Sequence, residues 1–397
     1  MSRVLMCWEL GANMGHIDRM LVCARALRLR GHEVTFAVKD LSRAHGRVVS
    51  DGFAVLQSPV WLPRMVNAPR LVNFSAVLAA AGWLDANGLA GLISAWRSLF
   101  SLCCPDLLVV DHGPTAILAM RGRNVPVAAI GNCFELPPHG EVFPAMNYWD
   151  SGDAAECARS DARVLAPVNQ ALALLGDAPL PRLTCLFEGV RCLAASLPEL
   201  THYPDYRSSD LVGPVYAGDI GLPPDWPDGN GARVFAYLSP EHADFNALME
   251  ALRQSGARAL VHAKGLAPEA GRRLGGGSMR FESSPLRMDA VVRDADLVIS
   301  HASMGTVTAA ALAGCVQLVL PNHMEQYMVA RRVVDGGFGL AVVPGAKGTD
   351  YLHLLRRLLE EPSFAQSAAK LAERHVDVDP SRTGDRLAAE LQGLLKL

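Results

Sequence analysis

The chain has 397 residues, of which half are apolar and 19% are charged, and its formal net charge is −3. This length predicts two or three domains, and the apolar content is sufficient to build a core in each of them. The low charged fraction argues against long disordered tails, and the absence of any Lys/Arg run argues against a nucleic-acid partner.

The chain opens with residues 1–9, a short apolar run followed by an acidic residue, which predicts a first β-strand and not a signal peptide. Residues 77–104 are rich in Ala, Leu and Trp, but polar and charged residues interrupt them. They therefore predict buried amphipathic helices and no transmembrane span. The nine Cys residues lack Cys-x-x-Cys spacing, so we interpret them as scattered thiols of a cytoplasmic protein.

Short β-branched runs alternate with helical patterns along most of the chain, and the alternation begins a second time after residue 232. The predicted strands cover residues 4–7, 34–37, 107–110, 125–130, 234–238, 259–262, 297–300 and 317–320. The predicted helices cover residues 20–30, 241–254, 305–313, 325–334 and 381–395. Strands that alternate with helices in this way predict parallel sheets.

The two alternating halves are separated by residues 213–231, where Pro and Gly are dense enough to break regular structure. We therefore predict an α/β fold of two Rossmann-like, doubly wound domains that face each other across a cleft. The domains are residues 1–213 and 233–378, joined by a linker over 214–232, and residues 379–397 carry the last helix. In such sheets, ligands bind beyond the carboxyl ends of the strands.

The strongest local motif follows the strand at 297–300, where His301 begins a small-residue turn that leads directly into a helix. Free backbone N–H groups and the positive end of the helix dipole make this start suitable for a diphosphate. Small residues would let the phosphates approach the backbone, Thr306 adds a hydroxyl, and His301 adds an imidazole N–H. The turn comprises Ser303, Met304, Gly305 and Thr306. An ordinary turn with a capping Ser or Thr is the alternative.

A second motif follows the strand at 317–320 and contains Glu325 and Gln326 at the start of another helix. A carboxylate accepts hydrogen bonds and an amide both donates and accepts them, so this pair suits the hydroxyl groups of a sugar. The alternative is an acidic residue that only complements the helix dipole.

The spacing of these motifs, from His301 through Gly305-Thr306, Gly314, Pro321 and Glu325-Gln326 to Arg332-Val333, resembles the signature of glycosyltransferase family 1. That family includes plant secondary-metabolite glucosyltransferases and bacterial antibiotic and natural-product glycosyltransferases, and its members have the GT-B fold. Weaker matches lie in the first strand–loop–helix, in residues 105–111 and in residues 211–214.

The resemblance implies roles for the residues that match. His301, Ser303, Gly305 and Thr306 would hold the donor diphosphate, and Glu325 and Gln326 would meet the transferred sugar. Two further segments resemble loops of the family that face the donor: one contains Ser239, and the other contains Arg287 and Met288. A simple helix N-cap is the alternative for Ser239. The last helix would cross back onto the N-terminal domain.

The sequence departs from the plant-type pattern at Ala309, where those members carry a Glu that binds both ribose hydroxyls. Ala309 follows Gly305 and Thr306 by one helical turn, so we expect it to face the same way. A 2′-deoxyribose has one hydroxyl fewer, so Ala309 favours a dTDP-sugar donor and leaves a UDP-sugar open.

The N-terminal half offers a base for the acceptor hydroxyl. Gly11 and Gly15 allow a tight loop, and His16 follows at the start of a helix. A neutral His suits this role if a carboxylate fixes its tautomer, and Asp111 follows a neighbouring strand. His112 and Asp18 are lesser candidates for the partner.

The resemblance agrees with this assignment, because Gly15-His16 matches the family's Gly-His pair, in which the His is the base, and Asp111 matches its partner. Arg19 stands where the family usually has Pro. We interpret it as altering the loop shape or adding a contact to the donor phosphate.

The inferred reaction is a direct displacement with inversion at the anomeric carbon. No Asp-x-Asp or His/Cys/Asp cluster has metal-ligand spacing, so neither a metal nor another cofactor is expected. The acceptor would be a small, apolar molecule on the N-terminal domain, and its predicted contacts are Asn13, Trp61, Trp83, Phe134 and Trp149. The alternative for each aromatic residue is a place in the core.

The expected partners are therefore a nucleotide-sugar donor and a small-molecule acceptor, and a homodimer is left open. Two other functions of the same fold also stay open: a non-catalytic auxiliary protein that activates a partner transferase, and a nucleotide-sugar epimerase. The missing ribose Glu favours the first alternative, and the pair of His16 with Asp111 argues against it.

Overall fold

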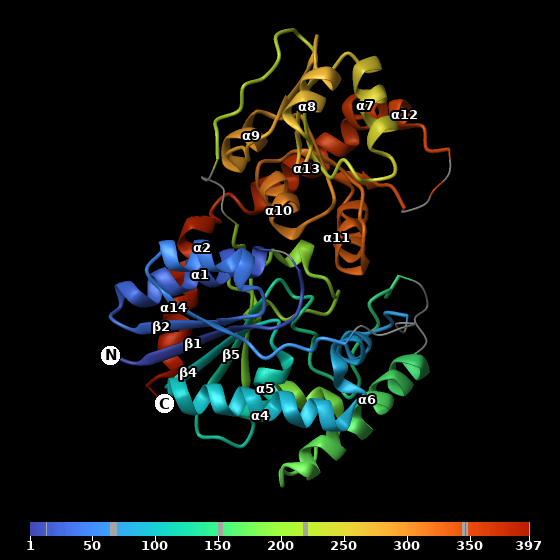
Figure 1. Ribbon diagram of the computed structural model, residues 1–397. Coiled ribbons are helices and arrows are strands. Elements are labelled where there is room, and N and C mark those ends of the chain that lie inside the picture. The colour runs from blue at the N-terminus through green and yellow to red at the C-terminus, as the bar shows by residue number, and fades with distance from the viewer. Residues whose placement is uncertain are drawn as a thin grey trace. The chain divides into compact units, whose positions relative to one another are not determined.

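The computed structural model describes all residues except 13, 64–69, 150–153, 217–220, 344–345, 347 and 397. The chain divides into two compact units, one made of Met1–Val215 with Asp379–Leu397 and the other of Tyr216–Val378. Each unit contains one six-stranded sheet in which all neighbouring strands are parallel (Figure 1). The predicted α/β fold of two doubly wound sheets is confirmed.

The first unit has the strand order β3-β2-β1-β4-β5-β6. Its strands are β1 (Arg3–Trp8), β2 (Glu33–Val38), β3 (Ala54–Gln57), β4 (Leu107–Asp111), β5 (Val127–Gly131) and β6 (Val190–Ala194). Its helices are α1 (Gly15–Leu29), α2 (Leu41–Ser50), α3 (Phe74–Leu78), α4 (Ala86–Cys103), α5 (Pro114–Met120), α6 (Ala154–Leu174) and α14 (Thr383–Leu394). A π-helical segment η1 (Ala79–Trp83) and short 3-10 turns η2 (Leu183–Phe187), η3 (Pro198–Leu200), η4 (Ser208–Asp210) and η5 (Pro380–Arg382) complete it.

The core of the first unit lies on both faces of its sheet, because side chains of a β-strand point alternately to opposite faces. In β1, Leu5 and Cys7 join the apolar cluster under α4, α5 and α6, whereas Met6 and Trp8 join the cluster under α1, α2 and α14 (Figure 1). A strand buried on both faces reads as a continuous apolar run, which is why these strands are recognisable in the sequence. Helix α14 contributes Leu387 to this second cluster.

The second unit has the order β12-β11-β10-β7-β8-β9, which is the same succession of crossovers as in the first. Its strands are β7 (Arg233–Leu238), β8 (Arg258–Ala263), β9 (Met279–Glu282), β10 (Leu297–Ser300), β11 (Val316–Val319) and β12 (Gly339–Ala341). Its helices are α7 (Phe245–Gln254), α8 (Pro268–Leu274), α9 (Met288–Asp294), α10 (Met304–Leu312), α11 (Met324–Asp335), α12 (Tyr351–Glu360) and α13 (Pro362–Arg374).

Several helix limits differ from those that the sequence predicts. Helix α1 begins at Gly15, five residues before the predicted start at 20, so His16 and Arg19 lie on the helix. Helix α7 begins at Phe245 and not at 241, because residues 239–244 form a turn in which the Ser239 carbonyl accepts from His242 N–H. Ser239 therefore does not cap α7.

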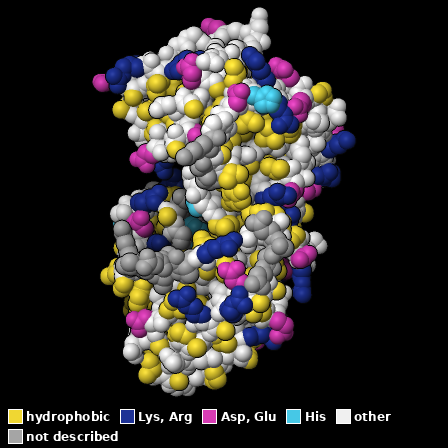
Figure 2. Space-filling model, turned by 90° about the vertical axis from the view of Figure 1, so that its right-hand side faces the viewer, with side chains coloured by type: hydrophobic (Ala, Val, Ile, Leu, Met, Phe, Trp, Pro, Cys, Tyr) yellow, Lys and Arg dark blue, Asp and Glu magenta, His cyan; other side chains and the backbone are white. Residues whose placement is uncertain are grey.

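Within the described residues, no single helix is long and apolar enough to cross a bilayer; Phe74–Trp83 and Ala86–Cys103 pass that test only as a pair bent by 86°. On the face shown in Figure 2, Lys and Arg side chains are interspersed with Asp and Glu, so the described atoms of that face form no continuous basic surface.

Candidate functional site

The topology of each sheet places one crevice at its carboxyl edge, where the order of the strands reverses. In the first unit this switch point lies between β1 and β4, and the register aligns Trp8 at the end of β1 with Asp111 at the end of β4. The loop after β1 leads into α1, so His16 comes to the same edge as Asp111. The backbone N–H of Leu10 donates to the His112 carbonyl at 2.9 Å and joins the two loops.

His16 and Asp111 form a close pair, as the sequence predicts. Nδ1 of His16 lies 2.7 Å from Oδ1 of Asp111, and the Asp111 side chain is completely buried. A carboxylate can only accept, so Nδ1 carries the hydrogen and Nε2 keeps its lone pair. This is the tautomer in which the ring can take a proton at Nε2.

Two further charged side chains join this pair. Arg19, one turn after His16 on α1, donates from Nε to Asp111 Oδ2 at 2.7 Å and from one terminal nitrogen to Asp111 Oδ1 at 2.8 Å. The same terminal nitrogen donates to Oε1 of Glu135 at 3.1 Å. Arg19 is therefore buried against two carboxylates, and the interpretation of it as a phosphate contact is wrong.

Glu135, which follows β5 by four residues, also belongs to this network and is not among the residues predicted from the sequence. Its Oε1 lies 3.7 Å from His16 Nδ1, and its Oε2 accepts from the backbone N–H of Asn132 at 2.9 Å. The signal that was available is its place directly after a strand that neighbours β4, since carboxyl ends of adjacent parallel strands meet at one edge.

The network sets the charge of its members. Burial raises the pKa of Asp111, but the Arg19 and His16 charges and their hydrogen bonds outweigh it and hold that pKa at about 2. Burial lowers the pKa of His16, but Asp111 and then Glu135 outweigh burial, so the pKa lies above its ordinary value. Burial lowers the pKa of His112 to about 4, so that ring is neutral at pH 7.

The His16 ring is held on its other sides by aromatic and glycine contacts. Trp8 stacks on it with 5.6 Å between ring centroids and 24° between planes. Gly11 has φ +82°, and a Cβ built there would stand 2.4 Å from His16 Nε2. Lys39 donates to the Gly11 carbonyl at 2.8 Å and fixes this loop. Asn13, a predicted acceptor contact in the same loop, lies outside the described residues.

One set of three metal-ligand atoms is present in the part of the chain that the structure describes: His16, His112 and Glu135 lie within 4.8 Å of one another. The guanidinium of Arg19 is 3.1 Å from Glu135 and 3.4 Å from His16 Nδ1. A positive group already lies against these atoms, so the arrangement suits an internal ion-pair network better than a cation.

The aromatic residues predicted to contact the acceptor separate into different environments. Trp83 is completely buried, and its indole N–H donates to Thr115 Oγ1 at 3.1 Å, so it is a core residue that offers no surface to a ligand. The Trp61 ring packs on the backbone of Gly82, where a Cβ would come within 2.3 Å of it. Phe134 is 8% exposed and contacts the His112 ring edge-on. Trp149 packs edge-on against Tyr148.

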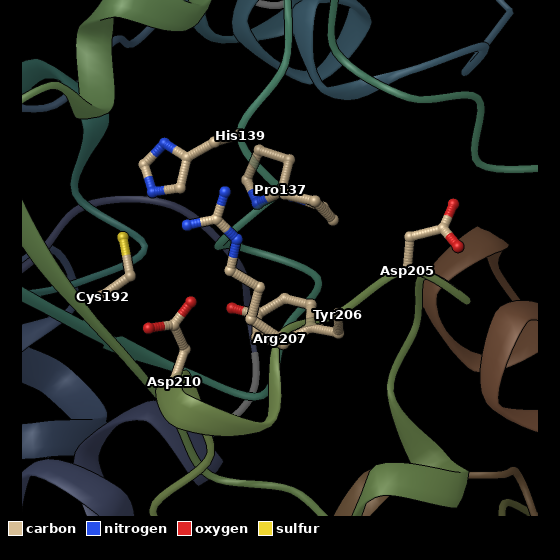
Figure 3. A pocket seen from close by; sticks show the side chains of 8 residues that line it. Pro137, His139, Cys192, Asp205, Tyr206, Arg207 and Asp210 are labelled. Carbon is tan, nitrogen blue, oxygen red and sulfur yellow. The ribbon is translucent and has the colours of Figure 1, made fainter.

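Two small hollows are present in the first unit. The first lies among Pro137, His139, Cys192, Tyr206, Arg207 and Asp210 and has a volume of about 40 Å³ (Figure 3). The second, of about 10 Å³, lies behind His112 and Glu135 against Phe74 and Phe187. Each has room for no more than one or a few water molecules, so neither holds an acceptor as it stands.

In the second unit the switch point lies between β7 and β10. The segment after β7 carries Ser239 and the segment after β10 carries His301. The Ser239 backbone N–H donates to His301 Nε2 at 2.8 Å, and His301 Nδ1 donates to the Leu320 carbonyl at 2.9 Å. Both ring nitrogens are therefore engaged, and donation to a phosphate would require Nε2 to leave Ser239 and gain a proton.

The start of α10 lies at the same edge, and the side chain of its N-cap residue Ser303 does not bond the helix backbone. Its first internal hydrogen bond runs from Val307 N–H to the Ser303 carbonyl, and Ser303 makes no side-chain cap, because its hydroxyl donates to Thr306 Oγ1 at 3.0 Å. Ala302, in the turn before α10, has φ +58°, a left-handed conformation that is costly for a residue with a Cβ. The dipole and the N–H groups of the first turn suit an anion.

Ala309 is buried in the core of the second unit. It is 1% exposed and belongs to the apolar cluster with Phe235 and Val298. Gly305, one turn earlier and half-buried, contacts Tyr216, which packs against the same cluster, and Thr306 is 5% exposed, in agreement with the expectation that the three face the same way.

The other predicted donor contacts already have partners inside the unit. Gln326 accepts from the Asn322 backbone N–H at 2.8 Å and closes its own turn. Arg287 pairs with Asp289 at 2.9 Å. Met288 begins α9 and packs against the apolar cluster of Ala309. Glu325 is partly exposed in the first turn of α11, 3.9 Å from His323.

Residues 278–388 match the family described as Erythromycin biosynthesis protein CIII-like, C-terminal domain. Elloramycin glycosyltransferase ElmGT of Streptomyces olivaceus is 40% identical over 77 residues, which is 19% of this chain and 19% of that protein. Over 99% of both chains, the structure of glycosyltransferase VinC in complex with dTDP has a TM-score of 0.70 and 18% identity.

The calicheamicin glycosyltransferase CalG4 has a TM-score of 0.73 and 18% identity over 100% of this chain and 98% of its own. SnogD from Streptomyces nogalater has a TM-score of 0.65 and 21% identity over 99% of each chain. The chain has the GT-B fold. The sequence relative and the three structural neighbours described above are glycosyltransferases by name, so the predicted resemblance to glycosyltransferases of natural-product biosynthesis is confirmed.

Proposed function

We propose that this GT-B protein is an inverting glycosyltransferase that moves a sugar from a nucleoside-diphosphate donor to a hydroxyl of a small, apolar acceptor. The observation that carries the proposal is the 2.7 Å hydrogen bond between His16 Nδ1 and the buried Asp111. It leaves Nε2 as the basic atom of a ring whose partner is negative, which is the arrangement required of a general base.

In the proposed reaction, Nε2 of His16 takes the proton of the acceptor hydroxyl while its oxygen forms a bond to the anomeric carbon of the donor. The bond from that carbon to the diphosphate breaks, and the electron pair leaves with the diphosphate oxygen. The N–H groups and dipole at the start of α10 would stabilise the leaving charge. The proposal needs no metal, because these donors supply the electrostatic stabilisation.

For the donor we propose a dTDP-sugar. The structures of VinC and of SsfS6 from Streptomyces sp. SF2575 are both of complexes with thymidine diphosphate. A UDP-sugar is the second choice. The homodimer and the cytoplasmic location stay predictions from the sequence.

The experiment has a binding arm and a transfer arm. Thermal-shift measurements with dTDP, UDP, ADP and GDP test the donor, and we expect stabilisation that is largest with dTDP. Transfer from dTDP-glucose to a panel of aromatic and polyketide alcohols tests the reaction. His16→Gln should keep dTDP binding and lose transfer by about 10²–10⁴-fold, whereas His45→Gln, an exposed residue on α2, should change neither.

The results of these two assays distinguish the proposed function from its alternatives. No stabilisation by any nucleotide would overturn the donor assignment, and undiminished transfer by His16→Gln would remove His16 from the role of base. Binding of dTDP by a protein that transfers nothing to any acceptor would favour the non-catalytic auxiliary. Conversion of the donor into an epimer would favour the epimerase.

A further inference from the structure

The ionised groups around His16 come from three different elements. Asp111 ends β4, Glu135 follows β5, and Arg19 lies on α1. Asp111 and Glu135 carry one negative charge each and Arg19 carries one positive charge, so the set has a net charge of −1 while His16 is neutral. The side chains of the three are at most 9% exposed, so water screens these charges little.

Three further side chains lie near this set. His112, which follows β4, is 5.8 Å away between ring centroids and is neutral at pH 7. Trp8 of β1 stacks on the ring. Lys39 is a cation 5.9 Å from the centroid of the Trp8 ring that donates to the Gly11 carbonyl, and it is the same in all variants compared below.

Arg19 offsets the negative charge that Asp111 presents to His16. Two hydrogen bonds at 2.7 and 2.8 Å bind the guanidinium across both oxygens of Asp111. This bidentate contact offsets the charge of Asp111, so Asp111 and Arg19 together are close to neutral. A protonated His16 beside that pair alone would be an uncompensated buried cation, which is unfavourable.

Glu135 supplies the missing negative charge. Its Oε1 is 3.7 Å from His16 Nδ1 and 3.1 Å from Arg19, and the Asn132 N–H fixes its Oε2 at 2.9 Å. We propose that Glu135 is a positioning residue for the His16 base: Arg19 holds the Asp111 and Glu135 carboxylates together at the Nδ1 side of His16, and the net charge of −1 becomes zero when His16 takes the proton of the acceptor. This inference rests on the proposed function of His16.

The test replaces Glu135 by Gln, which keeps an oxygen for the Asn132 N–H and removes the charge. Titration of His16 by NMR on His-labelled protein, assigned by loss of its signal in His16→Gln, measures the proton affinity without any substrate. In Glu135→Gln the pKa of His16 should fall by about one unit, a tenfold loss of proton affinity. The double variant Arg19→Gln/Glu135→Gln keeps the net charge of −1, and its pKa of His16 should return to within about half a unit of wild type.

A matched control is Asp161→Asn, which neutralises a carboxylate buried in the same unit that accepts from the Asn73 side chain and the Phe143 N–H. It should leave the pKa of His16 unchanged. In wild type, the carboxyl carbon signal of Glu135 should shift at the pKa of His16, and this measurement needs no variant to fold. In active protein, the acidic limb of kcat/KM should move to lower pH in Glu135→Gln by the same amount as the NMR titration.

The inference is overturned if the pKa of His16 is the same in Glu135→Gln as in wild type, or if it is as low in the double variant as in Glu135→Gln. It is also overturned if the chemical shift of the Glu135 carboxyl carbon does not change while His16 titrates. These outcomes are distinct from failure of the proposed function. If the protein transfers no sugar but shows the expected NMR shifts, the charge arrangement around His16 is supported and the role of His16 as a catalytic base is not.

Discussion

Replacement of Arg19 by Met tests whether the guanidinium is a structural part of the His16 site. The change keeps an apolar stem and leaves Asp111 and Glu135, whose side chains are 0% and 2% exposed, as two buried like charges. Loss of one partner from a buried ion pair costs about 3–5 kcal/mol of the free energy of unfolding. For a domain of 150–250 residues each kcal/mol lowers Tm by about 2–4 °C, so we expect the transition of the first unit to fall by roughly 6–20 °C.

Differential scanning calorimetry at pH 8 measures this loss, and Arg25→Met is its control on the same helix. Arg25 pairs with Asp51, but its side chain is 48% exposed, against 9% for Arg19. An exposed pair contributes at most about 1 kcal/mol. If Arg19→Met and Arg25→Met lose the same amount within about 1 kcal/mol, the buried network does not stabilise the unit as we argue.

The stability difference between wild type and Arg19→Met should also depend on pH. In wild type the pKa of Asp111 is depressed to about 2, because the Arg19 and His16 charges outweigh burial, which acts to raise it. That stabilisation is present above the unfolded pKa of about 3.9 and is lost as the pH falls toward 2. Without Arg19, burial would raise the carboxyl pKa values, and protonation would relieve the repulsion. The gap between wild type and Arg19→Met should therefore narrow from pH 8 to pH 5.

Three smaller predictions follow from the packing. Gly11→Ala and Gly31→Ala both place Ala at φ +82°, which costs about 1–2 kcal/mol, but only the first adds a Cβ 2.4 Å from His16 Nε2. Calorimetry should therefore show the larger loss in Gly11→Ala, and kinetics should show a loss of transfer in Gly11→Ala alone. Ala309→Glu buries a charge in an apolar cluster, so the second unit should lose stability. The variant should gain no affinity for UDP relative to dTDP, and a binding assay in which UDP became preferred would contradict this. Trp83→Phe should lower Tm and leave acceptor preference unchanged across a substrate panel.

The sequence is sufficient to predict the sheet architecture and the pairing of His16 with Asp111. Buried parallel strands such as β4 are continuous apolar runs, and the residue that follows or ends such a strand must lie at the carboxyl edge. Asp111 meets His16 because β1 and β4 are neighbours in register, a consequence of the doubly wound order. Topology alone therefore brings together two residues that are 95 positions apart.

The sequence is not sufficient to predict which partner a polar side chain selects. Arg19 has the same spacing from His16 whether it faces solvent or the core, and only the positions of Asp111 and Glu135 make burial of its charge favourable. Ala309 has the same spacing from Gly305 in any helix, and only the packing of α10 in the second unit, which brings Ala309 into the cluster with Phe235, decides that it is buried. Both cases depend on tertiary packing, which local periodicity does not contain.

The histidines at the two switch points have hydrogen-bond partners of opposite effect on their protonation. His16 Nδ1 donates to the carboxylate of Asp111, which favours the imidazolium and leaves Nε2 with its lone pair. His301 Nδ1 donates to the uncharged carbonyl of Leu320, and Nε2 accepts from Ser239, so a proton there would break a hydrogen bond that joins two loops. Burial accordingly lowers the pKa of His301, and the neighbouring His242 and His323 lower it further, whereas the pKa of His16 is raised. As the pH falls, His16 therefore takes up a proton before His301, so transfer should be lost over a pH range in which His301 is still neutral and dTDP binding is unchanged. Parallel titrations of activity and binding should separate the two, and a common midpoint would contradict this division of roles.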